Sequence, residues 1–220
     1  MNTIVDIEKT GEKFCLKTFL DARSTCIALT EQVIREISEG MNEKDIKSVH
    51  ERIFKTAGVL KFWHPTKIRV ASDTTKKFRD ISDPELKCTN GDLCFIDLGP
   101  IIQGHEADYG RTFVVGDLTA RHPLIDVCHT VFNETAKVWK EQGLSGQELF
   151  VFASDLAKQH GYVLNPDMSG HRLGDFPHKI FTTTGLFETA ITPSENLWVL
   201  EIHIVDPENQ RGAFFEDILF

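Results

Sequence analysis

Acidic residues occupy four positions inside or beside the most apolar segments of this 220-residue chain. Asp97 and Glu201 interrupt two runs that have the composition of buried strands, Asp108 comes shortly before a third run, and Glu216 lies in a fourth. A buried carboxylate without a partner is very costly, so strands of this kind normally exclude Asp and Glu. The chain must therefore fold so that these side chains share a partner, and a buried metal would be one.

The remaining pattern predicts two helix–helix–strand units. Apolar spacing and capping residues, among them the capping box Ser145-x-x-Glu148, predict helices over residues 21–39, 42–58, 123–143 and 145–161. Apolar runs predict strands over residues 93–99, 111–116, 197–204 and 213–220. Residues 63–90 predict a loop with short strands. This order favours an α+β fold in which helices cover one side of a mostly antiparallel sheet, in two similar halves.

Length and charge restrict the class of protein. A chain of 220 residues suits one domain, and a formal net charge of −9 without a basic block argues against nucleic acid and anionic membranes as partners. The five cysteines are scattered and form no C-x-x-C motif, which is typical of reduced thiols. Neither a signal peptide nor an apolar stretch of about 18 residues is visible. We therefore expect a cytoplasmic protein.

Hairpin geometry would bring the acidic residues together in pairs. If residues 93–115 form a hairpin that turns near Ile102 and Gln103, Asp97 lies almost opposite Asp108. If residues 206–211 form the loop of the last hairpin, Glu201 lies opposite Glu216. Carboxylates this close repel each other unless a proton or a cation intervenes. Two divalent ions would neutralise them.

A nitrogen ligand is expected between the two hairpins. His171 and His178 flank a short segment in which Gly170 and Gly174 allow a close approach of the backbone. Oxygen-rich ligation with a single histidine suits Mn, Fe, Co or Zn.

As a set, these residues resemble the pita-bread metallopeptidases, which include methionine aminopeptidases, Xaa-Pro aminopeptidases and prolidases. The resemblance runs from about residue 20 to the end. It rests on the spacing from Asp97 to Asp108, on His171 followed by His178, and on Glu201 followed by Glu216. It implies the pita-bread fold, with two pseudo-symmetric halves around a curved sheet, and two bound divalent metal ions.

The resemblance also implies a role for each residue. Asp97 would chelate one metal, Asp108 and Glu216 would bridge both, and His171 and Glu201 would complete the second site. Glu201 would also act as general base for the attacking water. His178 would hydrogen-bond the substrate amide or the tetrahedral intermediate. The implied activity is hydrolysis of the N-terminal residue from a peptide substrate.

The motifs around Arg111, Leu173 and Asp217 lean towards Xaa-Pro enzymes, whereas the short chain is similar to a methionine aminopeptidase. We expect one catalytic domain over residues 1–220 without an additional N-terminal domain, and a homodimer is possible on general grounds. Both branches carry a substrate-contacting histidine where this chain has Arg79 and Asp80. His64 is the nearest histidine and a candidate substrate contact, although a turn residue before Pro65 is the simpler interpretation.

Three alternatives stay open: a methionine aminopeptidase, a metallohydrolase of a non-peptide amide, and a non-catalytic binding module. Several neighbouring residues have simpler interpretations. We expect His105 at a solvated hairpin tip and Arg111 in an ion pair with Asp108. Asp175 and Asp217 are expected near the site without binding the metal. The three tryptophans are expected in the core: Trp63, Trp139 and Trp198.

Overall fold

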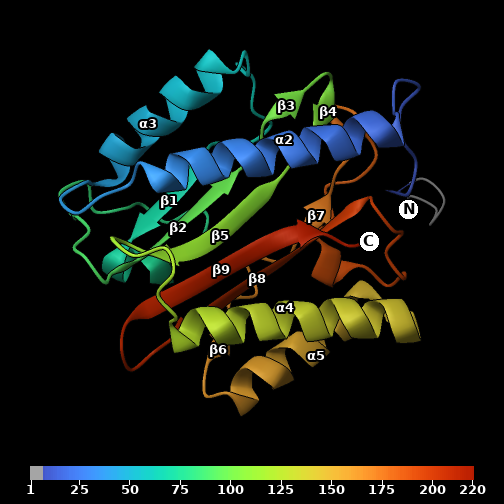
Figure 1. The fold of residues 1–220 in the computed structure, drawn as a ribbon. Helices are drawn as coiled ribbons and strands as arrows, with labels where there is room; N and C mark the ends of the chain where they lie inside the picture. The colour runs from blue at the N-terminus through green and yellow to red at the C-terminus, as the bar shows by residue number, and fades with distance from the viewer. Residues whose placement is uncertain (1–6) are drawn as a thin grey trace.

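A computed structural model describes residues 7–220 as a seven-stranded sheet with two pairs of long helices (Figure 1). The long helices are α2 (Leu16–Arg35), α3 (Glu43–Thr56), α4 (Pro123–Gln142) and α5 (Gly146–Gln159). The sheet contains β1 (Lys67–Val70), β2 (Leu93–Leu98), β5 (Tyr109–Val114), β9 (Arg211–Ile218), β8 (Trp198–Asp206) and β6 (Val163–Leu164) in that spatial order, with β7 (His171–Arg172) paired to β8. Its strand pairs are antiparallel. The predicted α+β class and pita-bread layout are confirmed.

Short elements connect these layers. A small ribbon of β3 (Ile101–Ile102) and β4 (His105–Glu106) extends from the β2–β5 hairpin. The 3-10 turns are η1 (Ala71–Thr75), η2 (His178–Ile180) and η3 (Leu186–Glu188). Within residues 7–220, no helix is long and apolar enough to cross a membrane.

The helix ends follow the sequence signals closely. Asn42 and Asp45 form a capping box at the start of α3, and Ser145 and Glu148 form the predicted one at α5. Gly143 ends α4 with a φ of 67°, a conformation that favours glycine. The first helix differs, because α2 begins at Leu16 and ends at Arg35, earlier at both ends than predicted.

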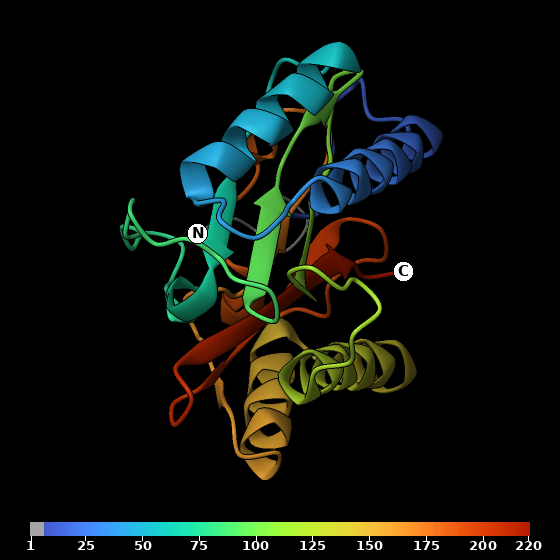
Figure 2. The same ribbon diagram turned by 60° about the vertical axis from the view of Figure 1, so that its left-hand side comes forward.

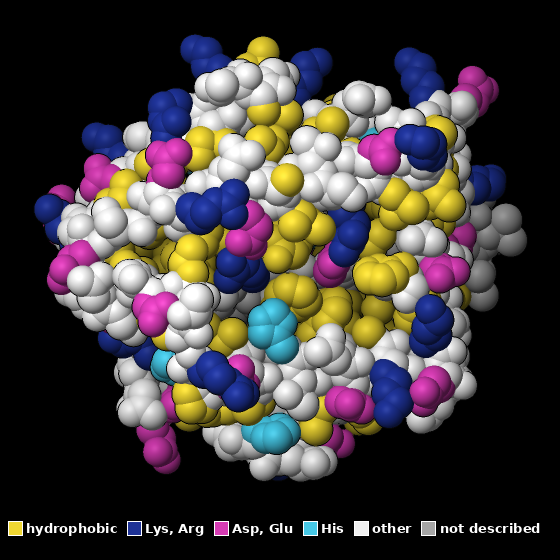
Figure 3. Space-filling view, viewed as in Figure 1, with side chains coloured by type: hydrophobic (Ala, Val, Ile, Leu, Met, Phe, Trp, Pro, Cys, Tyr) yellow, Lys and Arg dark blue, Asp and Glu magenta, His cyan; other side chains and the backbone are white. Residues whose placement is uncertain are grey.

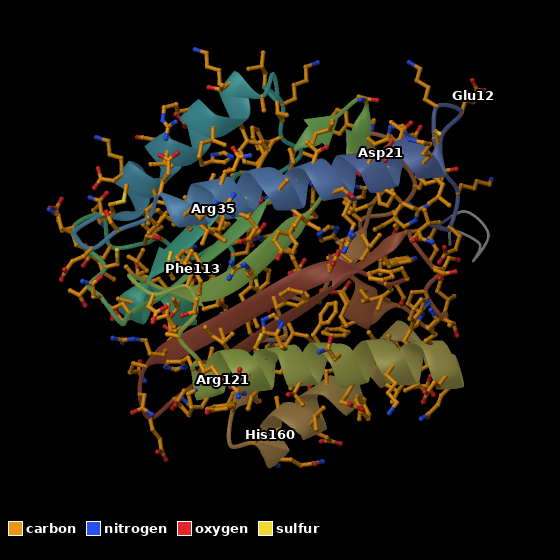
Figure 4. The ribbon with its side chains drawn as sticks, in the orientation of Figure 1. Glu12, Asp21, Arg35, Phe113, Arg121 and His160 are labelled. Carbon is orange, nitrogen blue, oxygen red and sulfur yellow. The ribbon has the colours of Figure 1, made fainter. Side chains whose placement is uncertain are left out.

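Each helix pair covers one half of the sheet, as two views show (Figures 1 and 2). Ile34 and Ile46, from α2 and α3, pack in one apolar cluster with Ile96 of β2 and with Phe113, which is labelled on β5 in Figure 4. A second cluster joins α4 and α5 to β8 and β9; it includes Val131, Leu149, Leu200, Ile202 and Ala213. The sheet is therefore buried by helices on one face.

The helix-covered side presents a mixed surface. On the face shown in Figure 3, Lys and Arg side chains alternate with Asp and Glu side chains among apolar ones. Such alternation of both signs is what a solvated surface requires. The chemistry indicated by the buried acids therefore has to be sought on the other face of the sheet.

Strand alternation sends the acidic residues to that other face. Asp97 lies between Ile96 and Leu98, which both pack under α2 and α3, and Glu201 lies between Leu200 and Ile202, which pack under α4 and α5. Because successive side chains of a strand point to opposite faces, both carboxylates must point away from the helices.

The two hairpins differ in how well their register was predicted. Glu201 pairs with Glu216 and Val205 with Gly212, so the prediction for the last hairpin is confirmed. In the first hairpin, Asp97 pairs with Gly110, not with Asp108, and that prediction was wrong. The turn lies at Gln103 and Gly104, which have φ values of 50° and 77°. A two-residue turn with positive φ shifts the pairing by two residues relative to a turn at Ile102 and Gln103.

Gly110 lies between two acidic residues, since it pairs with Asp97 on one side and Glu216 on the other. A β-carbon at this position would come within 2.6 Å of Glu216 Oε1 and 2.7 Å of the Ile96 carbonyl oxygen. The Glu216 carboxylate thus occupies the space that a side chain at position 110 would need.

We predict that Gly110→Ala lowers the free energy of unfolding by about 1–3 kcal/mol, because the added methyl group overpacks this space. Urea denaturation followed by circular dichroism measures the change. Gly174→Ala is the matched control, because its β-carbon would meet nothing nearer than the end of the Arg172 side chain at 3.3 Å. Equal unfolding midpoints for the two variants would contradict the prediction.

Candidate metal centre

Four carboxylates meet at the floor of one cavity on the open face of the sheet. The cavity measures about 790 Å³, and its lining includes Asp97, Asp108, Glu201 and Glu216. Asp97, Asp108 and Glu216 are at most 4% exposed, and the Glu201 side chain is 12% exposed. Asp108 comes from the two-residue link between β4 and β5. The structure thus brings all four predicted acidic residues together.

His171 reaches the same floor from β7, where it pairs with Val199 of β8. Its Nδ1 lies 3.0 Å from the Arg172 carbonyl oxygen, which can only accept, so Nδ1 carries the proton. Its Nε2 lies 2.8 Å from Asp108 Oδ2 and 3.4 Å from Glu201 Oε1. Gly170 makes this approach possible, since a β-carbon there would lie 2.3 Å from the Val199 carbonyl oxygen.

The structure also places His64 in the site, which the interpretation as a simple turn residue did not anticipate. Its Nε2 lies 3.4 Å from Asp97 Oδ1 and 3.3 Å from Asp108 Oδ1, and its side chain is 7% exposed. The backbone N–H of Trp63 donates to the Gly99 carbonyl at 2.9 Å and holds this segment against the end of β2.

Trp63 is partly buried: it packs against a small apolar cluster that includes Phe19 and Leu173, and it also lines the cavity, so the predicted core position holds only in part. Its indole Nε1 donates to the Ala107 carbonyl at 3.0 Å. Its ring lies 4.3 Å, 4.7 Å and 5.2 Å from the rings of His64, His171 and His178, measured between centroids. Trp139 and Trp198 are buried as predicted. The indole therefore contacts three imidazoles of the site edge to face.

His178 is held by an acidic residue that the sequence analysis missed. Glu106 is 1% exposed; its Oε2 lies 2.7 Å from His178 Nδ1, and its Oε1 accepts the backbone N–H of His178 at 3.0 Å. The signal was present, because Glu106 lies two residues before Asp108 in an extended segment and so tends to face the same way. The expected solvated tip is wrong for this region. His105 is 3% exposed and accepts the backbone N–H of Cys15 at 2.9 Å.

Other predicted contacts lie elsewhere. Arg111 pairs with Glu31 of α2 through two hydrogen bonds of 2.6 Å and 2.8 Å, and the expected pair with Asp108 is therefore wrong. Asp217 forms an ion pair with Arg23 of α2. Asp175 accepts the backbone N–H of Gly11 at 2.7 Å. Arg111 and Asp217 thus tie β5 and β9 to α2, and Asp175 ties its loop to the segment before α2. Arg79 and Asp80, which stand where a histidine was expected, line the same cavity.

Burial and neighbouring charges together set the pKa values of the four acids. Burial raises the pKa of Asp97 to about 6 and that of Glu201 to about 7, although nearby histidines oppose both shifts. Burial and the neighbouring Asp108 raise the pKa of Glu216 well above its usual range. Burial would also raise the pKa of Asp108, but the rings of His64 and His171 outweigh it and hold that pKa low.

The two histidines respond in the opposite direction. Burial disfavours a charged ring, yet Asp97 and Asp108 raise the pKa of His64 to about 9. Asp108 and Glu201 likewise raise the pKa of His171 to about 9. The buried acids therefore stabilise a positive charge on both neighbouring imidazoles.

The donor set fits divalent metal ions. Glu216 Oε1 is buried and has no hydrogen-bond partner among the described residues. One ligand atom each from Asp108, His171 and Glu216 lies within 4.8 Å of the others, and the same holds for His64, Asp97 and Asp108. A buried carboxyl oxygen without a hydrogen-bond donor is costly unless a proton or a cation joins it. Carboxylate oxygens with imidazole nitrogens are ligands of Mn, Fe, Co and Zn.

Solved structures share this fold. A prolidase from Pyrococcus horikoshii OT3 aligns over 97% of this chain and 60% of its own, with a TM-score of 0.73 and 22% identity. An X-Pro aminopeptidase from Thermotoga maritima MSB8 aligns over the same shares, with a TM-score of 0.76 and 17% identity. At these identities the likeness concerns the fold.

Sequence relatives point the same way. An Xaa-Pro dipeptidase from Pyrococcus furiosus is 28% identical over 129 residues, which are 59% of this chain and 36% of the relative. The chain thus spans well under two thirds of the length of the relatives it matches. The model of metallopeptidase family M24 matches residues 19–220, a range that contains the clustered acids and histidines. By this match over nearly the whole chain, the protein belongs to metallopeptidase family M24.

Proposed function

We propose that this protein is a divalent-metal-dependent aminopeptidase that releases N-terminal residues from peptides, with a leaning to substrates that carry proline in the second position. The observation that carries the proposal is the meeting of five potential ligands at the floor of one cavity. The ligands would be Asp97, Asp108, His171, Glu201 and Glu216, and they would hold two ions. Family membership and the Xaa-Pro relatives support the activity and the leaning.

The chain's own groups can perform the proton transfers. Bound divalent ions would supply Lewis acidity towards the scissile carbonyl and an activated water. Glu201 is suited to accept the proton of the attacking water, because its partly exposed carboxylate reaches the cavity beside the other expected ligands. The protonated Glu201 carboxyl can then deliver that proton to the departing amine.

His178 is suited to hold the substrate amide. Glu106 accepts from its Nδ1, which leaves Nε2 of the neutral ring as an acceptor. Burial lowers the pKa of His178, although Glu106 opposes the shift, and this favours the neutral ring. A neutral Nε2 would accept a hydrogen bond from a substrate N–H group. This supports the amide contact over donation to a tetrahedral oxyanion.

The substrate prediction is that N-terminal release is abolished by a chelator and strongest for peptides beginning Ala-Pro. The assay measures the released residue from peptides beginning Met-Ala, Ala-Pro and a neutral pair, with Mn²⁺ or Co²⁺ and a chelator control. Release confined to Met-Ala would make the protein a methionine aminopeptidase. Tight metal binding without cleavage of any peptide would contradict the proposal and favour a non-peptide amide or a binding module.

The general-base prediction concerns Glu201→Gln. We expect turnover to fall by about 100- to 10,000-fold, the usual contribution of a general base, while the fold is kept. Glu208→Gln, at the exposed loop of the same hairpin, is the matched control and should retain turnover. Steady-state kinetics and circular dichroism measure both. Near wild-type turnover in Glu201→Gln with metal present would remove the general-base role.

The bridging prediction concerns Asp108→Ala. Its two oxygens face two histidines on opposite sides, so its loss should reduce metal content as well as activity. Elemental analysis after dialysis measures the metal content per chain. Asp155→Ala, an exposed position on α5, serves as the control. Unchanged metal content in Asp108→Ala would contradict the bridging role.

A further inference from the structure

The two imidazoles at the floor of the cavity are held in matching ways. His64 Nδ1 lies 3.0 Å from the Pro65 carbonyl oxygen, just as His171 Nδ1 lies 3.0 Å from that of Arg172. A carbonyl only accepts, so each Nδ1 carries a proton, and a ring without a second proton on Nε2 presents the Nε2 lone pair. This is the arrangement by which proteins orient metal-binding histidines.

Both lone pairs point at carboxylate oxygens from opposite sides of Asp108. His64 Nε2 faces Oδ1 of Asp108, whereas His171 Nε2 faces Oδ2. His64 Nε2 also faces Asp97 Oδ1. An imidazole lone pair directed at two ionised oxygens is repulsive unless a proton or a metal cation lies between them.

The distances around His64 match the edges of a coordination polyhedron. Two donors that each lie about 2.1 Å from one ion, at angles of about 90–110°, are about 3.0–3.4 Å apart. The separations of 3.3 Å and 3.4 Å from His64 Nε2 to the two oxygens fall at the upper end of this range. Direct ion-pair hydrogen bonds are shorter, about 2.7–2.9 Å.

The backbone around His64 is shaped for this approach. A β-carbon on Gly99 would lie 2.1 Å from both Nε2 and Cδ2 of His64. The Lys61 carbonyl accepts the backbone N–H of Ile101 at 2.8 Å, and with the Trp63 contact this ties residues 61–63 to residues 99–101. The backbone that carries His64 is therefore held against the end of β2 by hydrogen bonds, and Gly99 leaves the space that the imidazole ring fills.

We propose that His64 is a metal ligand that completes the ion site of Asp97 and Asp108, so that each of the two ions has one imidazole. This rests on the metal centre of the proposed function and adds a nitrogen ligand to a site for which the family resemblance implies only carboxylates. Imidazole favours Zn²⁺ and Co²⁺ over Mn²⁺. The first ion site of this chain should share that preference.

The direct test is proton NMR of the Co²⁺-loaded protein. Each imidazole bound through Nε2 keeps its Nδ1 proton, which gives a strongly shifted signal that disappears in D₂O. The wild type should show two such signals, and His64→Ala one. His160→Ala, at the exposed end of α5 (Figure 4), should match the wild type. A single such signal in the wild type would overturn the proposal, whether or not the variant folds.

Calorimetric titration with Co²⁺ gives an independent measure. Loss of a group that only orients a metal ligand weakens binding by about 10–100-fold, so loss of His64 should weaken one of two sites by about 100-fold or more. Unchanged affinity at both sites would also overturn the proposal. Two shifted signals without peptide cleavage would keep His64 as a ligand and refute the aminopeptidase. Peptide cleavage together with a single shifted signal would keep the aminopeptidase and refute His64 as a ligand.

Discussion

The structure depends on the alternation of side chains in one antiparallel sheet, whose one face builds the core and whose other face carries the site. Alternate side chains of β2, β8 and β9 pack under the four helices, and the side chains between them point to the open face. Asp97, Glu201 and Glu216 lie on that open face only because their neighbours are anchored under the helices. A slip of one residue in any of these strands would bury a carboxylate against the helices. The core packing therefore determines which side chains reach the site.

Asp108 is the electrostatic centre of the cluster. It has an oxygen facing each of two imidazoles, and its ionised form raises the pKa of Glu216 beside it. Without cations, the positive rings of His64 and His171 are what balances the buried acids. Divalent ions would take over the balance of charge that protons on these rings and acids otherwise provide. Without cations, burial, together with Asp97 and Asp108, also raises the pKa of Glu201 to about 7.

The sequence predicted most of the helices and strands, and also the four acids and His171 that meet at the floor of the cavity. It could do so because periodicity, helix caps and costly buried charges are local signals. It could not predict the turn at Gln103 and Gly104, since a glutamine with positive φ carries little signal. It missed Glu106 and undervalued His64, whose roles depend on contacts with segments distant in sequence. Arg111 was assigned to the wrong acid because its own strand turns it towards α2, where Glu31 lies.

Gly99 has a consequence for how such a site can change during evolution. Its missing side chain leaves the volume that the ring of His64 fills, so any larger residue there would displace the imidazole even if the histidine were kept. Replacement of His64 by a smaller residue, in contrast, causes no clash at Gly99, because a glycine tolerates an empty neighbour. The order of substitution at the two positions is thus restricted. A histidine at position 64 can arise only where position 99 is already glycine, and Gly99 can be replaced only after His64 has been lost. Among relatives, they should therefore vary together.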